Sequence, residues 1–144
     1  RHLSKEKLAD VFYNYGEERQ ARRIAAHIVQ SREERAIETT RQLADIVAAA
    51  IPRKYHPKKK HVATKVFQAL RIAVNRELDN LVRVLADAPL VLRPGARICV
   101  ITFHSLEDRI VKQAFISNSA YEVVVRRPVE PAPDEIRANP RSRS

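Results

Sequence analysis

The sequence predicts an α/β fold preceded by an all-helical region. Its first fifty residues show apolar side chains at helical spacing and no strand pattern. Later, a β-branched apolar run at residues 98–101 follows the turn signal Pro94 and Gly95. That run leads through a polar loop containing His104 and Ser105 into another helical pattern. Strand, polar loop and capped helix in this order form an α/β unit, with the loop at the ligand-binding end of the strand.

Local signals define three helices in the N-terminal region. Ser4 is placed to cap the first helix and Gly16 to end it. The second helix is expected at about residues 17–31, with Ile24, Ala25 and Ile28 facing inward. The third begins at a capping box formed by Thr39 and Gln42 and ends near Ile51 and Pro52.

A basic loop follows at residues 53–61, and it contains Tyr55 and two histidines among its lysines and arginine. Such a loop is often only solvated, but lysines beside an aromatic ring are also typical of single-stranded RNA binding. No carboxylate or thiol lies near the two histidines in sequence, so we expect no metal site.

One long helix is predicted from Thr64 to about Ala88. Its expected core stripe consists of Phe67, Leu70, Val74, Leu78, Leu81, Leu85 and Ala88. Beside the stripe, Gln68, Arg71 and Asn75 form a polar ridge at helical spacing. The pattern leaves two roles open for this ridge, namely internal hydrogen bonds and contact with a substrate.

The α/β unit contains two predicted strands and one helix. Residues 98–101 and 121–125 have strand character, and residues 106–116 have helical character. Ser105 is expected to cap this helix with Asp108, and Cys99 to be a buried core residue. Two strands alone do not make a stable sheet, so this unit requires further strands.

The charge of the chain points to a polyanionic partner. Its 144 residues have a net charge of +10, and most of the excess lies in residues 1–65. Because no long apolar segment is present, nucleic acid is a more plausible partner than a membrane. A single cysteine excludes a disulfide framework and indicates a reducing compartment. With two glycines in the chain, neither a Gly-x-Gly-x-x-Gly motif nor a P-loop exists.

Four motifs resemble a known family, that of the small-subunit ribosomal RNA cytosine-N4 methyltransferases, also called MraW or RsmH. The motifs are Tyr-Gly-Glu-Glu-Arg at residues 15–19 with Arg-Arg-Ile-Ala at 22–25, Phe-Gln-Ala-Leu-Arg-Ile-Ala-Val-Asn at 67–75, Phe-His-Ser-Leu-Glu-Asp-Arg-Ile-Val-Lys at 103–112 and Asn-Pro-Arg-Ser at 139–142. They occur in the family's order over nearly the whole chain, and they match the later part of that family only.

The resemblance implies a Rossmann-like methyltransferase core interrupted by an inserted helical domain. Residues 1–62 would be the inserted, rRNA-recognising domain, and residues 63–144 the C-terminal part of the core. The implied reaction is methylation of the exocyclic N4 amine of a cytidine in small-subunit rRNA. S-adenosylmethionine would be the cofactor, bound mainly by residues outside this chain, so that the chain alone is inactive.

The resemblance also implies site residues and partners. His104 and Ser105 are the candidate catalytic-site residues, and His104 is either a proton acceptor or a structural hydrogen-bonding group. The candidate RNA-binding residues are Arg19, Arg22, Arg23, Lys60, His61, Lys65, Arg71 and Asn75. Lys65 stands where the family usually has arginine, which gives up bidentate phosphate geometry.

The expected partner is small-subunit rRNA or the assembling small ribosomal subunit, in the cytoplasm and without a membrane; a homodimer is left open. The main alternative is a basic RNA-binding module without activity of its own. A helical DNA-binding protein is less consistent, because no compact helix-turn-helix pair appears and the α/β unit would be unexplained.

Overall fold

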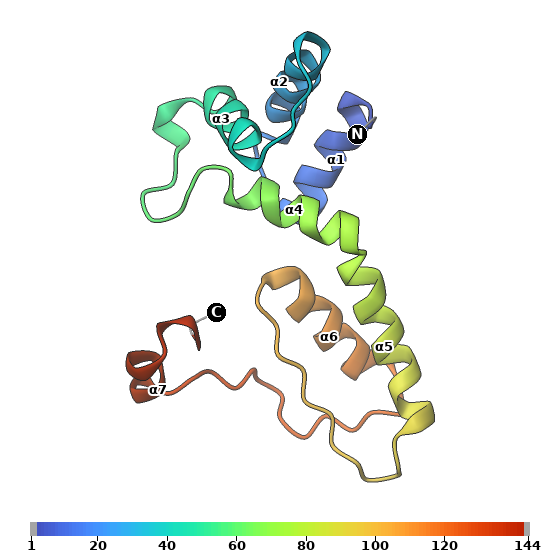
Figure 1. Cartoon of the computed structure of the whole chain (residues 1–144). Helices are drawn as coiled ribbons and strands as arrows, with labels where there is room; N and C mark the ends of the chain where they lie inside the picture. Colours follow the sequence, from blue (N-terminus) through green and yellow to red (C-terminus); the bar gives the residue numbers. More distant parts are fainter. Residues whose placement is uncertain (1–2, 143–144) are drawn as a thin grey trace. The chain divides into compact units, whose positions relative to one another are not determined.

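The structure is a computed structural model that describes residues 3–142, and within them every regular element is a helix (Figure 1). The chain divides into two compact units, Arg1–Glu77 and Leu78–Ser144. The predicted helical region is confirmed. The predicted strands are wrong for this part of the chain, so the Rossmann-like core is not formed by the described residues.

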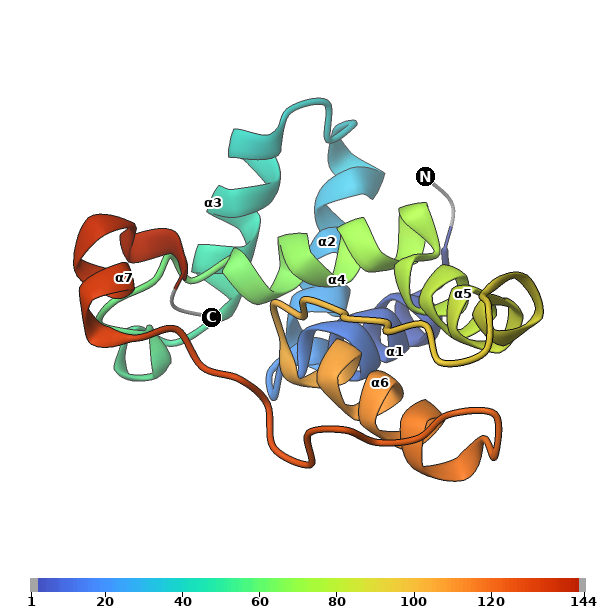
Figure 2. The ribbon, with the colours of Figure 1, turned by 90° about the horizontal axis from the view of Figure 1, so that it is seen from below.

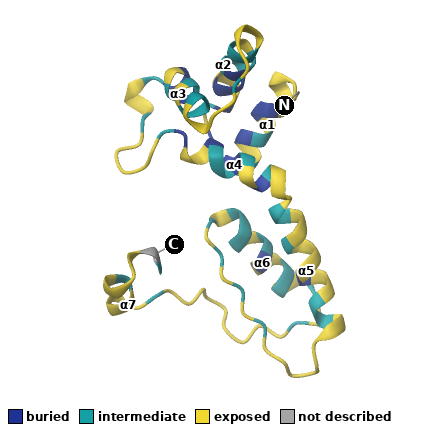
Figure 3. Ribbon diagram, viewed as in Figure 1, coloured by how far each residue is buried: buried dark blue, intermediate teal, exposed yellow. Residues whose placement is uncertain are grey.

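The first unit contains α1 (Lys5–Gly16), α2 (Ala21–Glu34), α3 (Thr40–Ala50), the short 3-10 helix η1 (Arg53–Tyr55) and α4 (Thr64–Asn75). α1 packs against both α2 and α4, and α2 packs against α3 (Figures 1 and 2). The four α-helices enclose one apolar core, whose buried residues are dark blue in Figure 3. Its members include Leu8, Phe12, Ile24, Ala25, Ile28, Val47, Ala50, Val66 and Ala69.

The helix caps expected in this unit are present. The Ser4 hydroxyl accepts a hydrogen bond from the Lys7 N–H at 3.3 Å. At the start of α3, Thr39 Oγ1 accepts from the Gln42 N–H at 3.2 Å, and Gln42 Oε1 accepts from the Thr39 N–H at 2.9 Å. Both ends of the capping box are therefore closed, as the spacing predicts.

α1 ends at Gly16 as predicted, but for a different reason. The left-handed residue is Glu17, with φ of 48°, whereas Gly16 lies against α4. A Cβ on Gly16 would stand 2.6 Å from the Lys65 carbonyl oxygen, so only glycine allows this approach of the two helices. The Lys65 ammonium donates to the Glu17 carbonyl at 2.8 Å and so holds the end of α1 against α4.

The start of α2 also differs from the prediction. The helix begins at Ala21 rather than near residue 17, because Glu17 leaves the helical region and the Glu18 N–H bonds back to the Phe12 carbonyl at 3.1 Å. The buried Glu18 carboxylate accepts from the Gln20 N–H at 2.9 Å. The inward positions Ile24, Ala25 and Ile28 are buried, as expected.

The predicted long helix is broken at Arg76, which has φ of 53°. α4 stops at Asn75 and α5 (Glu77–Val91) begins immediately after the break. The predicted core stripe is confirmed in part: Leu85 is buried and Phe67 and Leu70 pack against the core of the first unit, but Val74 is 78% exposed. The buried residues of α4 are Val66, Ala69 and Ile72, and the first two lie one position before the predicted Phe67 and Leu70. The shift follows from packing against α1, which the helical period alone does not reveal.

The second unit contains most of α5, then α6 (Ser105–Ser117), α7 (Pro133–Ala138) and the 3-10 helix η2 (Pro140–Ser142). Its apolar core is small, because Leu85 and Val111 are its buried apolar residues among those that the structure describes. The Tyr121 hydroxyl donates to the Leu85 carbonyl at 2.7 Å, and its ring meets Phe115 edge to face at 5.0 Å between centroids. Most of this unit is exposed in Figure 3.

Neither predicted strand forms. Residues 98–101 and 121–125 have no regular structure, and Cys99, predicted to be buried, is exposed. Ile101 is 77% and Val124 is 72% exposed. A strand exists only through hydrogen bonds to a neighbouring strand, and no pairing occurs within residues 3–142. The apolar runs are therefore present without the ladder that would bury them.

Candidate functional site

The polar loop before α6 is organised by His104 rather than by Ser105. His104 is the N-cap of the helix, and its Nδ1 accepts from the Glu107 N–H at 3.4 Å. Glu107 Oε2 reaches back to accept from the Phe103 N–H at 2.8 Å. The predicted cap by Ser105 and Asp108 is wrong by one residue. Glutamate can span this return distance, whereas the aspartate in the predicted pair is one methylene shorter.

The His104 ring has one nitrogen without a hydrogen bond. Its Nε2 is buried, has no hydrogen-bond partner among the described atoms, and lies 3.4 Å from Glu107 Oε1. When Nδ1 accepts a hydrogen bond from the backbone, the neutral imidazole carries its hydrogen on Nε2. In this tautomer Nε2 is a hydrogen-bond donor, and the Nδ1 lone pair is used by the cap.

A group of unpaired cations lies at the start of α2, and we call Arg19, Arg22 and Arg23 the arginine cluster. All three are exposed, and their guanidinium groups have no hydrogen-bond or ion-pair partner within the part of the chain that the structure describes. The first turn of α2 contains no acidic residue, and its N-cap Gln20 makes no side-chain cap bond. Cations at a helix N-terminus are unfavourable, and a bound anion would offset this cost.

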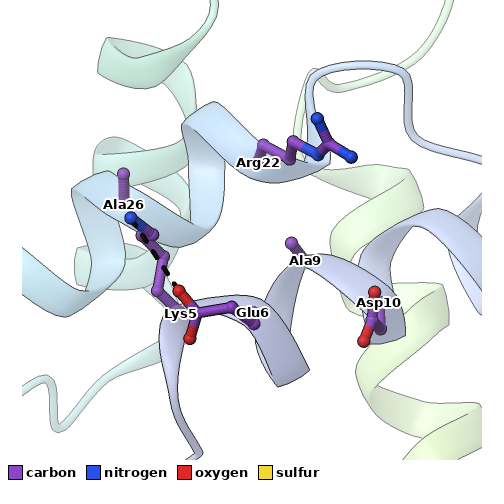
Figure 4. Close-up of a pocket in the computed structure, with 6 residues that line it drawn as sticks. All are labelled: Lys5, Glu6, Ala9, Asp10, Arg22 and Ala26. Atoms are coloured by element: carbon purple, nitrogen blue, oxygen red, sulfur yellow. Dashed lines mark ion pairs between the residues drawn. The ribbon is translucent and has the colours of Figure 1, made fainter.

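Two neighbouring surface depressions lie between α1 and α2. Arg22 and Ala26 of α2 face Lys5, Glu6, Ala9 and Asp10 of α1 around the first (Figure 4). The second is lined by Ala9, Asp10, Tyr13, Arg19, Gln20, Ala21, Arg22 and Arg23, and so contains the whole arginine cluster. Hydrogen bonds from its own backbone N–H and from Ser4 lower the pKa of Glu6, so its carboxylate stays charged at neutral pH.

Three other predicted RNA-binding residues of the first unit already have partners inside the chain, namely Lys65, Arg71 and Asn75. Lys65 bonds the Glu17 carbonyl, as described above. Arg71 Nε and Nη2 donate to the Glu77 carboxylate at 2.9 and 3.0 Å, and Asn75 Nδ2 donates to it at 3.1 Å. Two of the three ridge residues, Arg71 and Asn75, are therefore bonded across the break between α4 and α5, which supports the structural alternative for these two.

The basic loop between α3 and α4 has local order. The His56 Nε2 donates to the Ile51 carbonyl at 2.8 Å, and His61 Nδ1 accepts from the Ala63 N–H at 3.2 Å. Tyr55 is 56% exposed, with the Lys54 ammonium 5.0 Å from its ring centroid. Lys60 is exposed on the same loop. Both ends of the loop are thus anchored, and its aromatic and basic side chains remain accessible.

Sequence reasoning missed three residues that shape these surfaces. Glu77 gathers Arg71 and Asn75, and Glu107 completes the cap on α6. Tyr13 lines the depression beside the arginine cluster. Tyr13 could have been found, because a helix that buries Leu8 and Phe12 directs position 13 outward.

No helix among the described residues is long and apolar enough to cross a membrane. The fold and its surfaces define a basic, helical chain whose unpaired guanidinium groups match the chemistry of phosphate. The family model described as the MraW methylase family matches residues 1–144. The chain belongs to this family.

Individual relatives agree with the family match. The chain is 58% identical over 141 residues to a protein named ribosomal RNA small subunit methyltransferase H from Desulfotalea psychrophila, covering 98% of the chain and 48% of that protein. Proteins of the same name are 53% identical in Rippkaea orientalis and 49% identical in Trichodesmium erythraeum, covering 98% and 99% of the chain and 45% and 50% of those proteins. The chain spans about half the length of these curated relatives.

Proposed function

We propose that the full-length protein methylates the exocyclic N4 amine of a cytidine in small-subunit rRNA with S-adenosylmethionine as methyl donor. This chain is then its later, substrate-binding portion, with residues 1–62 as the inserted rRNA-recognising domain and residues 63–144 as part of the methyltransferase core. Membership of the MraW methylase family supports the class of reaction. The exposed, unpaired arginine cluster is the observation that most supports a role in binding RNA.

The residues of this chain do not fit the cofactor. A cofactor loop needs glycines at positions where the backbone meets the ligand, and neither glycine here meets that need. Gly16 is buried against the Lys65 carbonyl, and Gly95 lies in a turn with φ of 78° and open space around it. We propose that the cofactor is held mainly by residues outside this chain, and we assign the described residues to the RNA.

The chain's contribution to the reaction is to hold and orient the target nucleotide. A cytosine amine is a weak nucleophile because its lone pair is delocalised into the ring, so its placement matters more than its activation. The target base must also leave its stack, and phosphate contacts on either side keep the strand in place while it does so. Among the predicted RNA-binding residues, the arginine cluster and Lys60 are the cations accessible for these contacts. The proposed partner is rRNA or the assembling small subunit in the cytoplasm.

His104 and Ser105 are proposed to line the wall of the catalytic site at the start of α6. The lone pair of His104 Nδ1 accepts the hydrogen bond from the Glu107 N–H. The neutral ring therefore has no free lone pair for a proton from the substrate. We therefore assign His104 a positioning role and leave proton removal to another group.

Two substitutions separate capping from proton transfer at His104. In the full-length protein, His104→Asn is expected to leave the free energy of unfolding unchanged, because asparagine is a good N-cap. Its kcat is expected to stay within about threefold of wild type. His104→Ala is expected to lose about 1 kcal/mol of stability with the cap. A kcat at least tenfold lower in a folded, stable His104→Asn variant would contradict a role limited to positioning the cap.

The second candidate function is an RNA-binding module without activity of its own, and the exposed arginine cluster supports it equally. For the 144-residue chain the two functions give the same expectation, which is RNA binding without methyl transfer. Fluorescence anisotropy with a labelled single-stranded oligoribonucleotide measures the binding, and S-adenosylmethionine titration measures the cofactor affinity. Tight cofactor binding by this chain alone would overturn the assignment of the cofactor site to other residues.

A further inference from the structure

Tyr13 is an exposed aromatic side chain in a place where the fold does not need one. Its side chain is 64% exposed, although it belongs to a helix whose buried face is formed by Leu8, Ala9 and Phe12. Tyr13 lines the second depression between α1 and α2, together with the arginine cluster. Proteins that bind single-stranded nucleic acid combine aromatic rings, on which bases stack, with cations that bind phosphates. Tyr13 and the arginine cluster provide this combination.

The charges around Tyr13 indicate how a bound strand would lie on this surface. The second depression has Arg19, Arg22 and Arg23 on the α2 side and Asp10 on α1, and the first adds Glu6 of α1. Lys5 lies 3.9 Å from the Glu6 carboxylate and offsets part of that charge. Phosphates are attracted to the arginine cluster and repelled by Asp10, so a strand bound here would have its backbone on the α2 side and a base over α1.

We propose that Tyr13 is a stacking platform for an unpaired base of the RNA, with the arginine cluster binding the adjoining phosphates. This inference rests on the proposed RNA-binding function and names a specific nucleotide subsite within it. Stacking does not depend on the hydrogen-bonding groups of the base, so the site accepts any unpaired base. In a base-paired duplex the neighbouring base pairs cover the face of each base, so no base face is available to stack on Tyr13.

Substitution of Tyr13 tests this proposal with the 144-residue chain and a fluorescently labelled, unstructured oligoribonucleotide. Tyr13→Phe keeps the aromatic face and is expected to bind within about twofold of wild type. Tyr13→Leu keeps apolar bulk without the aromatic face and is expected to bind at least about fivefold more weakly, as removal of one stacked base predicts. Because Tyr13 is largely exposed, circular dichroism of both variants should match wild type.

The same titration with an RNA duplex is the matched control. Duplex affinity is expected to be unchanged by Tyr13→Leu, because only phosphate contacts remain. Equal affinity of wild type and Tyr13→Leu for the single strand would overturn the stacking proposal while leaving RNA binding intact. Absence of single-strand binding by wild type would overturn both the stacking proposal and the RNA-binding role of the chain.

A charge variant tests the direction of the strand. Asp10→Asn removes the carboxylate beside Tyr13 and is expected to strengthen single-strand binding about twofold to fivefold at low salt, with the gain disappearing as salt rises. Weaker binding by Asp10→Asn would contradict the proposed placement of the backbone.

Discussion

Replacing Arg19, Arg22 and Arg23 together with glutamine is expected to weaken RNA binding by this chain on the order of 10-fold to 100-fold near 0.1 M salt. The cluster is exposed and has no partner within residues 3–142, so the substitution removes phosphate contacts without breaking internal bonds. Three lost phosphate contacts on a single strand should also lower the slope of log affinity against log salt by about 2. Titrations at four or five salt concentrations measure both quantities.

A second triple variant controls for net charge. Arg126→Gln, Arg127→Gln and Arg137→Gln remove the same charge from exposed positions of the second unit. This variant is expected to change RNA affinity by less than about threefold, because long-range attraction is screened at this salt concentration. Equal losses in the two triple variants would mean that RNA responds to overall charge and not to the arginine cluster.

Gly16→Ala is expected to destabilise the chain by about 1–3 kcal/mol. The new methyl group would stand 2.6 Å from the Lys65 carbonyl oxygen, which is a backbone atom and cannot rotate away. α1 and α4 must then separate, which also stretches the 2.8 Å bond from Lys65 to Glu17. Alanine's better helix propensity offsets part of this cost but not all of it. Urea unfolding followed by far-ultraviolet circular dichroism measures the change.

Ala69→Gly, combined with Gly16→Ala, tests which close contact causes the loss of stability, that with the Lys65 carbonyl or that with the Ala69 Cβ. The Cβ of Ala69 would be 3.3 Å from the added methyl group, a milder approach than that of the backbone. We therefore expect Ala69→Gly not to restore the stability of Gly16→Ala. Full recovery in the double variant, or an unchanged urea midpoint in Gly16→Ala alone, would show that α1 and α4 can tolerate a side chain here.

The elements that the sequence predicts correctly are those specified by neighbouring residues. The cap at Ser4 and the capping box of Thr39 and Gln42 depend on side chains three residues apart, and both are present in the structure. Inward positions on α2 also follow from its own period. Local rules were sufficient there because one helix contains all the information that they use.

The errors occur where the outcome depends on distant residues or on a choice between two overlapping local signals. The apolar runs at 98–101 and 121–125 have strand composition, but a strand is completed only by a partner. The break at Arg76 interrupts a pattern of good helical period, and the bonds from Arg71 and Asn75 to Glu77 span it. The cap on α6 moved from Ser105 to His104 because Glu107 can close the reciprocal bond.

The candidate RNA surface was predictable in part. Composition and motif identified Arg19, Arg22 and Arg23, and the structure adds that these three line one depression without internal partners. It also separates them from Lys65 and Arg71, whose side chains bond within the chain. Sequence alone could not make this distinction, because a cation's partners depend on which helices meet.

The most direct test of the proposed function is the identity of the methylated nucleoside. Full-length protein is incubated with undermethylated small ribosomal subunits and isotope-labelled S-adenosylmethionine, and the digested rRNA is analysed by mass spectrometry. We predict labelled N4-methylcytidine, formed at a rate that falls when Arg19, Arg22 and Arg23 are replaced. Label in another nucleoside, or no label in rRNA with active protein, would contradict the proposed reaction.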